Sequence, residues 1–458
     1  MTQLAATRNS HQTNFTRLGG DSVTTTQPWL EELRNTAMDR FNLVGFPGHK
    51  EEEWRFTNVD PISKTHFNLA APVTNPAEVE AATAFSFGRS AATELIFING
   101  HYVHQLSRLG KLPRGAKVQS LAEAITTNAP ELSRYLGQYA EIEKNPFVAL
   151  NTGFVRDGAF IYLPRGTSID SPIHLLFVSV PSAEPAVTHP RVLVIAEEAV
   201  HASIVESYVG EKGGVYFTNA VTEIIAGADS RIDHCKLQQE SNDAYHVATT
   251  QAHLARAAQF VSHSTTIGAR LTRNDLNVTL AGEHADATIN GLVLLDGVRH
   301  CDNHTLLDHV AANCPSHELY KHVLTGKSTG VFKGKILVRQ DSQKTDSKQT
   351  SKTLLLSDDA KMNSMPALEI YADDVKCTHG STTGPVDEEQ VFYLQSRGIS
   401  HEASRHLLTY AFAADITRRI RVEPVRARIE NFMAAQHGLP QDLRITDLGA
   451  HDEAVVNA

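Results

Sequence analysis

The sequence is poor in cysteine and in long apolar runs, and both shortages restrict what it can be. Four cysteines in 458 residues, with no C-x-x-C pair, exclude a disulfide framework and fit a reducing cytosol. No stretch approaches the roughly 18 apolar residues of a membrane-spanning helix. Residues 1–27 lack the apolar core of a secretory signal, although their basic, Thr/Ser-rich start faintly resembles a transit peptide. We therefore expect a flexible tail at 1–27 and a cytoplasmic protein that enters no membrane.

Positive charge and nucleotide-binding motifs are also scarce. The net charge is −10 with histidine neutral, which argues against nucleic acid as a partner. The sequence contains no complete G-x-x-x-x-G-K-[ST] loop, because GKSTG (326–330) lacks the upstream glycine. No G-x-G-x-x-G follows a strand-like run and opens a helix-like one. We therefore expect that this chain binds no nucleotide and is not an enzyme.

Changes in hydrophobic periodicity and composition divide the rest of the chain into three parts. Residues 28–144 are typical of a helical or mixed domain, with apolar residues at helical spacing near its start. Residues 145–385 contain one short run of β-branched residues after another, which predicts an all-β segment. Residues 386–458 return to helical spacing, with Ser400 as the expected N-cap of the first long helix.

An internal repeat in the β segment predicts its architecture. An Ile-Ala or Leu-Ala pair followed by a polar turn and a new strand recurs at spacings of 30, 29 and 26 residues, beginning at Ile195, Ile225, Leu254 and Leu280. Repeats of this length indicate solenoid coils that each bury an apolar face against the next coil. The sequence thus favours a mainly β fold, a parallel β-helix flanked by helical domains. A β-sandwich with coincidental spacing is the alternative.

The richest cluster of metal-binding residue types lies at 300–322. It contains C-x-x-H twice, at Cys301/His304 and at Cys314/His317. Thiolate and imidazole are the usual ligands of zinc and other borderline metals. In a solenoid, side chains one coil apart stack, so the four residues are candidate ligands. The alternative is a set of polar turns with a buried cysteine.

A second cluster lies at 372–384, in ADDVKCTHGSTTG. Cys377 and His379 are two residues apart, so on a strand they share a face. Sulfur and imidazole together can bind a soft metal. The alternative is a strand end with an inert thiol.

Several strings resemble the SufB/SufD family of the SUF iron–sulfur cluster assembly system, over about residues 30–435. SKQTSKTLLL (347–356) has no cysteine where the SufB branch carries one, so the SufD branch is the better match. The strings that carry the resemblance are EEEWRFTN (51–58), NPFVALNTGFVRDGAFIYLPRG (145–166), DNHTLLDH (302–309), KSTGVFKGKILVRQDSQKTDSKQTSKTLLLS (327–357), LEIYADDVKCTHGSTTG (368–384) and DEEQVFYLQSRGIS (387–400).

The resemblance implies a fold, a role and partners. The β-helix is expected to be right-handed and to pair end to end with SufB. At that junction the nascent cluster is expected to form, or iron to bind, transiently. His379 would lie there, with Cys377 beside it in a less certain role. The C-terminal helices, with the stripe Leu408, Phe412 and Ile416, would dock the ABC-type ATPase SufC. A homodimer of the isolated chain, a flavin in the complex, a carbohydrate-active β-helix enzyme and a scaffold without metal all stay open.

Overall fold

A computed structural model of the chain describes residues 14, 27–127, 129–210 and 213–437. The expected tail at 1–27 lies almost entirely outside the described residues. Among those that are described, no helix is both long and apolar enough to cross a membrane.

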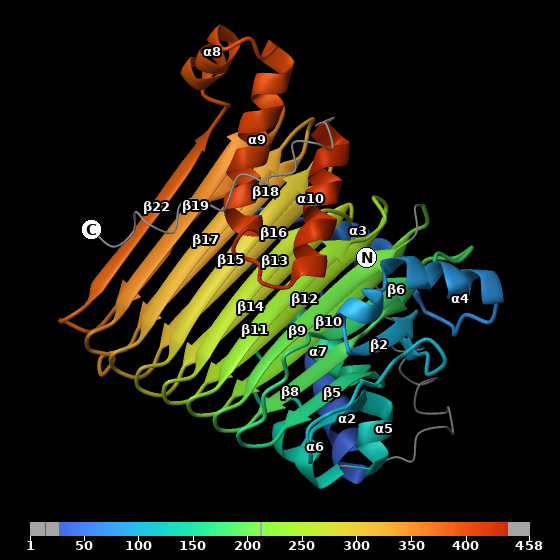
Figure 1. Ribbon diagram of the computed structural model, residues 1–458. Helices are drawn as coiled ribbons and strands as arrows, with labels where there is room; N and C mark the ends of the chain where they lie inside the picture. The colour runs from blue at the N-terminus through green and yellow to red at the C-terminus, as the bar shows by residue number, and fades with distance from the viewer. Residues whose placement is uncertain (1–13, 15–26, 128, 211–212, 438–458) are drawn as a thin grey trace.

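The predicted mainly β fold is confirmed, because a parallel β-solenoid of about 8 turns forms the centre of the molecule (Figure 1). Each turn adds one strand to each of two facing sheets. In order along the chain, sheet A contains β4 (Lys117–Ser120), β5 (Gly158–Leu163), β8 (Arg191–Ala196), β10 (Tyr216–Ala226), β12 (Tyr245–Leu254), β14 (Leu271–Leu280), β16 (His300–His309), β18 (Thr329–Val338) and β20 (Lys361–Ser364), with β1 (Asn68–Leu69), β7 (Ala186–Thr188) and β21 (Ala367–Ile370) alongside.

Sheet B contains β3 (His101–Tyr102), β2 (Thr93–Ile98), β6 (Ile173–Ser179), β9 (His201–Gly210), β11 (Arg231–Gln239), β13 (Gln259–Thr266), β15 (Asp286–Leu295), β17 (Pro315–Leu324), β19 (Asp346–Leu355) and β22 (Lys376–Gly384). Successive coils pair in parallel; β2–β3 and β4–β5, near the N-terminal end of the solenoid, are antiparallel. Alternate residues of each strand face the interior between the sheets, where the main apolar core lies.

The sequence repeat corresponds to these coils, but its register differs from the simple echo. The column that stacks is Ala196, Ala226, Leu254 and Leu280, so the alanine of an Ile-Ala pair aligns with the leucine of a Leu-Ala pair. A one-residue difference in register reverses which side chain faces inward. The repeat therefore identified the coils, and the hydrogen-bonded ladder set the inward column.

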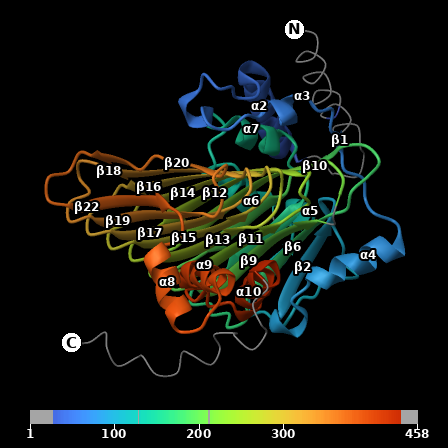
Figure 2. The same ribbon diagram turned by 90° about the horizontal axis from the view of Figure 1, so that it is seen from above.

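Helices cover the outer faces of both sheets, on opposite sides of the solenoid (Figure 2). On the sheet A side lie α2 (Pro28–Val44), η1 (Glu52–Trp54), α3 (Asp60–Lys64) and α7 (Pro146–Gly153). The segment expected to be all-β thus begins with a helix, because Asn145 caps it through Phe147 N and Pro146 occupies its first turn. The remaining N-terminal elements are α4 (Pro76–Ala82), η2 (Thr83–Phe85), η3 (Gly88–Ser90), α5 (Leu121–Thr127) and α6 (Ala129–Tyr135).

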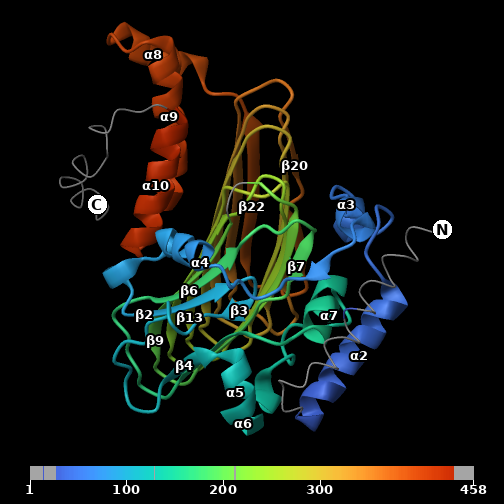
Figure 3. The ribbon, with the colours of Figure 1, turned by 90° about the vertical axis from the view of Figure 1, so that its right-hand side faces the viewer.

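The C-terminal helices are α8 (Glu388–Ser396), α9 (His401–Thr417) and α10 (Glu423–His437). The side chain of Ser400 accepts a hydrogen bond from Ala403 N, so the predicted N-cap of α9 is confirmed. α9 contacts β15 and β17 on the outer face of sheet B. α8 stands beyond α9, at the opposite end of the molecule from α5 and α6 (Figure 3).

Candidate functional site at the open end of the solenoid

The C-terminal end of the solenoid leaves strands without a neighbour. In the part of the chain that the structure describes, β22 is the last strand of sheet B and pairs only with β19, and β20 and β21 both pair with β18 at the matching end of sheet A. An unpaired strand edge presents backbone donors and acceptors to another chain. The side chain of Tyr371 is 64% exposed beside this edge. Among the described residues, this end of the core is therefore uncovered.

Cys377 and His379 lie on β22 at this uncovered end and face the same side, as predicted from their spacing. The β-ladder places Cys377 on Ser347 and His379 on Gln349, and both partners are buried inward residues of β19. Ser381, two residues further on, donates to the Ser364 hydroxyl across the interior at 2.9 Å. Cys377 packs against the main apolar core, whereas His379 is exposed because no further coil covers it.

Cys377 and His379 alone do not supply enough ligands for a metal or cluster site within one chain. Burial, with Asp346 nearby, raises the pKa of the Cys377 thiol above its ordinary value, so the protonated thiol is favoured. No group of three or more His, Cys, Asp or Glu side chains able to hold a metal ion occurs in the described parts of the chain. An iron–sulfur cluster is held by four ligands. Two side chains at an open end therefore need further ligands from elsewhere.

The cluster at 300–322 is not brought together. Cys301 faces the interior of β16 and packs with Leu324 and Met362, and His304 faces outward on the same strand. Residues three apart on a strand point to opposite faces, so the C-x-x-H spacing separates the cysteine from the histidine once the segment forms a strand. Cys314 is buried in the main core before β17, and His317 is exposed on the outer face of β17. Burial raises the pKa of the Cys301 thiol to about 12 and also raises the pKa of Cys314.

His304 takes part in an ion-pair cluster that holds the segment 51–58 on sheet A. Its ring nitrogens lie 3.1 Å from Asp302 Oδ1 and 3.2 Å from Glu53 Oε2. Burial opposes the imidazolium, but these carboxylates raise the pKa of His304 overall. Arg273 binds Asp302 at 2.7 Å and stacks over the Trp54 ring. In this arrangement both ring nitrogens of His304 face carboxylates, and the raised pKa favours the imidazolium.

The apolar stripe of α9 belongs mostly to the fold of this chain. Ile416 is fully buried against the outer face of sheet B, and Leu408 and Phe412 are half-buried. Lys321 of β17 fixes the helix by donating to Phe412 O at 2.9 Å and by pairing with Asp415 at 2.8 Å. The exposed aromatic residues of this region lie instead on α8, where Phe392 is 72% and Tyr393 is 58% exposed. In the sequence, the apolar run VFYL within α8 could have indicated this exposed aromatic surface.

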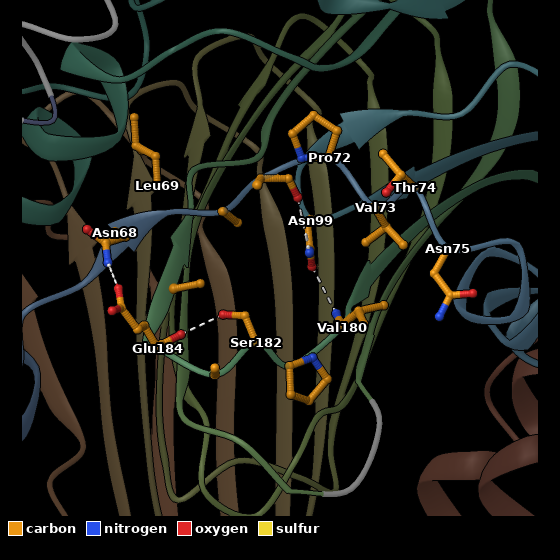
Figure 4. Close-up of a pocket in the computed structure, with 15 residues that line it drawn as sticks. Asn68, Leu69, Pro72, Val73, Thr74, Asn75, Asn99, Val180, Ser182 and Glu184 are labelled. Atoms are coloured by element: carbon orange, nitrogen blue, oxygen red, sulfur yellow. Dashed lines mark hydrogen bonds between the residues drawn. The ribbon is translucent and has the colours of Figure 1, made fainter.

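Two other features of the chain do not form a reactive site. GKSTG (326–330) also has the spacing G-x-S-x-G of a hydrolase nucleophile elbow, but it runs from the turn after β17 into the start of β18, and Ser328 is fully buried. A hollow of about 540 Å³ lies between the segments 68–75 and 180–186 (Figure 4). Glu184 is the one ionisable side chain among its described lining residues, and Asn68 Nδ2 already donates to it at 2.7 Å.

Family models and curated relatives agree on what this chain resembles. The SufBD core domain of SUF system iron–sulfur cluster assembly matches residues 178–412, and the SufBD N-terminal region matches residues 11–175. A SufBD family iron–sulfur cluster assembly protein of Synechocystis is 32% identical, over 89% of this chain and 91% of that protein. The iron–sulfur cluster assembly protein SufD of Escherichia coli is 30% identical, over 84% and 88%. The chloroplast protein ABCI7 of Arabidopsis is 26% identical, over 88% and 85%.

Proposed function

Because the chain belongs to the SufBD family of the SUF iron–sulfur cluster assembly system, we propose that it is a non-catalytic, cytoplasmic scaffold subunit. It pairs with SufB, docks the ATPase SufC and contributes His379 to a nascent cluster or iron at the SufB junction. The observation that carries this proposal is the position of His379 on the inward side of the last strand, at the uncovered end of the solenoid.

The open end supports pairing with a second solenoid. A partner strand beside β22 would satisfy its free backbone groups and extend sheet B, a common mode of protein recognition. The same contact would bring the partner's side chains next to His379 and Cys377. A two-ligand site would then gain the ligands that it lacks. In the absence of SufB, a second copy of this chain would meet the same edge, so the isolated protein would form a homodimer.

The exposed aromatic residues of α8 support the docking of SufC to the C-terminal helices. Phe392 and Tyr393 project from a helix that stands beyond the solenoid, whereas the stripe of α9 is used to hold α9 on sheet B. Large exposed aromatic residues are enriched among the residues that dominate binding energy at interfaces. SufC would supply ATP hydrolysis, so this chain needs no nucleotide site of its own.

The test is reconstitution of the purified complex with SufB and SufC. We expect His379→Ala to assemble normally and to load much less iron and acid-labile sulfide than wild type. Cys377→Ala is expected to be milder, because its thiol packs in the core and is protonated. Thr378→Ala, the outward neighbour between them, is the matched control. If His379→Ala loads like wild type, the ligand role is excluded; if it prevents SufB binding, the residue is an interface contact.

The same preparations test SufC docking. Phe392→Ser is expected to lose SufC while keeping SufB. Leu43→Ser replaces a residue of α2 that is 75% exposed on the far side of the molecule, and it should keep both partners. Retention of SufC by Phe392→Ser would exclude this face of α8.

A further inference from the structure

Three inward side chains of consecutive coils stack directly beneath the open end. The β-ladders pair Glu318 of β17 with Gln349 of β19, and Gln349 with His379 of β22. Neighbouring strands lie about 4.8 Å apart, so each side chain is within reach of the next. One coil further in, the column continues with Ile289, an apolar residue that pairs with Glu318 and separates it from the buried Ser262 and His234 beyond. The ladder therefore connects a buried carboxyl group to His379 on the side of the open end.

The contact between the first two members fixes the orientation of the Gln349 amide. Gln349 Nε2 donates to Glu318 Oε2 at 2.7 Å. Burial raises the pKa of Glu318 to about 7, and it is the nitrogen end of the amide that points at this carboxyl group, so the carbonyl oxygen Oε1 faces another direction. Gln349 is 2% exposed, and its Oε1 has no hydrogen-bond partner among the described residues. A buried carbonyl oxygen without a donor is costly, so this atom is an acceptor in need of a partner.

The facing sheet leaves room for this amide. Gly334 of β18 is an inward residue of sheet A, and a Cβ atom built on it would lie 2.2 Å from Gln349 Nε2. Any residue larger than glycine at this position would displace the amide. The glycine, the carboxyl group and the glutamine thus form a fitted arrangement one coil below His379.

We infer that Gln349, held by Glu318, is a positioning residue for His379. His379 stands next to this carbonyl oxygen in the ladder and is its proposed donor: a hydrogen bond from one ring N–H, which the structure itself does not contain, would fix the tautomer of the imidazole. The other ring nitrogen then carries the lone pair and faces the open end, where a borderline metal such as ferrous iron is bound. Histidines that ligate metals generally donate their second ring N–H in this way, to a carbonyl or a carboxylate. The metal part of this inference depends on the proposed function; the hydrogen bond does not.

The hydrogen bond is tested on the isolated full-length chain by ¹⁵N NMR of labelled histidine at about pH 8, where an ordinary imidazole is neutral. The signals of His379 are identified by their loss in His379→Gln. We expect a single tautomer in wild type and a mixture of both in Gln349→Met, which keeps the volume and removes the acceptor. Ser351→Ala, an inward residue two positions along β19, is the matched control. A single unchanged tautomer in Gln349→Met would overturn the inference.

Glu318 is tested in the same experiment. Glu318→Gln keeps an oxygen that accepts from Gln349 and should preserve the single tautomer, whereas Glu318→Leu should give the mixture. Gly334→Ala changes none of the three polar residues, but its methyl group should displace the Gln349 amide and so give the mixture of tautomers. If Glu318→Leu keeps the wild-type tautomer, Glu318 does not hold Gln349. A thermal melt of each variant shows that it is folded.

Cluster loading separates this inference from the proposed function. In the complex with SufB and SufC, Gln349→Met should assemble normally and bind iron or load clusters roughly ten- to hundredfold less well. Loss of loading in His379→Ala with no loss in Gln349→Met would leave His379 as a ligand and reject the positioning role. Wild-type loading by His379→Ala would reject the proposed function, and the tautomer measurement would still decide the hydrogen bond.

Discussion

The two ends of the solenoid differ in how their buried polar groups are paired, although single atoms without a partner, such as Arg191 Nε, occur at both among the described residues. At the N-terminal end, Arg191 and Glu223 form a fully buried ion pair at 2.5 Å beneath α7. Glu223 also accepts from three backbone N–H groups, and Arg191 also donates to the side chains of Asn151 and Thr152. At the C-terminal end, the Gln349 carbonyl oxygen, the Ser351 hydroxyl and the Thr353 hydroxyl lack partners among the described residues.

This difference shows which end is built for stability and which for contact. A buried charge is tolerated only when its partners satisfy it, and α7, packed on the outer face of sheet A, covers the strands of the N-terminal, closed end where this ion pair lies. At the other end, no helix or further coil of the described residues covers the last strands, and their edges are free. Substitutions at the closed end should therefore change folding, and substitutions at the open end should change assembly.

The largest expected effect is at the closed end. Arg191→Ala leaves Glu223 as a buried charge without its cation, which costs about 3–5 kcal/mol of unfolding free energy. Denaturant unfolding monitored by tryptophan fluorescence measures it. The control is Arg256→Ala, which removes the exposed ion pair with Asp229 and should change stability by at most about 1 kcal/mol. Equal effects of the two substitutions would remove the distinction between the two ends.

A smaller effect is expected where α9 is fixed to sheet B. Lys321→Ala removes the bond to Phe412 O and the pair with Asp415, which should cost about 1–3 kcal/mol. Hydrogen exchange should then increase in His401–Thr417 and stay unchanged in the coils around β9 and β11. Lys352→Ala, an exposed lysine beside it in the ladder, should leave exchange as in wild type. Faster exchange throughout the solenoid would show that α9 belongs to the same cooperative unit.

The smallest expected effect is the pH dependence of the segment 51–58 on sheet A. The pKa of His304 is raised in the folded state. The stability that the His304 imidazolium contributes to this contact is therefore complete below its ordinary pKa of 6.5 and is lost as the pH rises through the pKa of the folded state. The hydrogen bond from His304 is the largest cause that lowers the pKa of Glu53, to about 2. The stability that the ionised Glu53 carboxylate contributes is present above its ordinary pKa of 4.5 and is lost as the pH falls toward 2.

The segment should thus be held most firmly between about pH 4.5 and 6.5. Hydrogen exchange or limited proteolysis of residues 51–58 across this range is the measurement, corrected for the intrinsic pH dependence of the method. His304→Gln should abolish the loss on the alkaline side and reduce the loss on the acidic side, where Lys333 still lowers the pKa of Glu53. A pH profile in His304→Gln identical to that of wild type would show that the imidazole does not control this contact.

Local patterns in the sequence were sufficient for the architecture. Short β-branched runs repeating every 26 to 30 residues predicted the parallel solenoid, and Ser400 predicted the start of α9, because strand alternation and helix capping depend on near neighbours. The two-residue spacing of Cys377 and His379 likewise fixed their common face. The motif strings identified the family, which the core and N-terminal family models confirm.

Only the tertiary structure decided which of these residues meet. Cys301 and His304 share a motif but point to opposite faces of β16, and Ile416 belongs to a stripe that covers sheet B. The column Glu318, Gln349 and His379 joins residues about thirty positions apart, and no local pattern marks it. Its existence depends on the register of the ladder, since a one-residue shift in strand pairing would direct these side chains to the outer face.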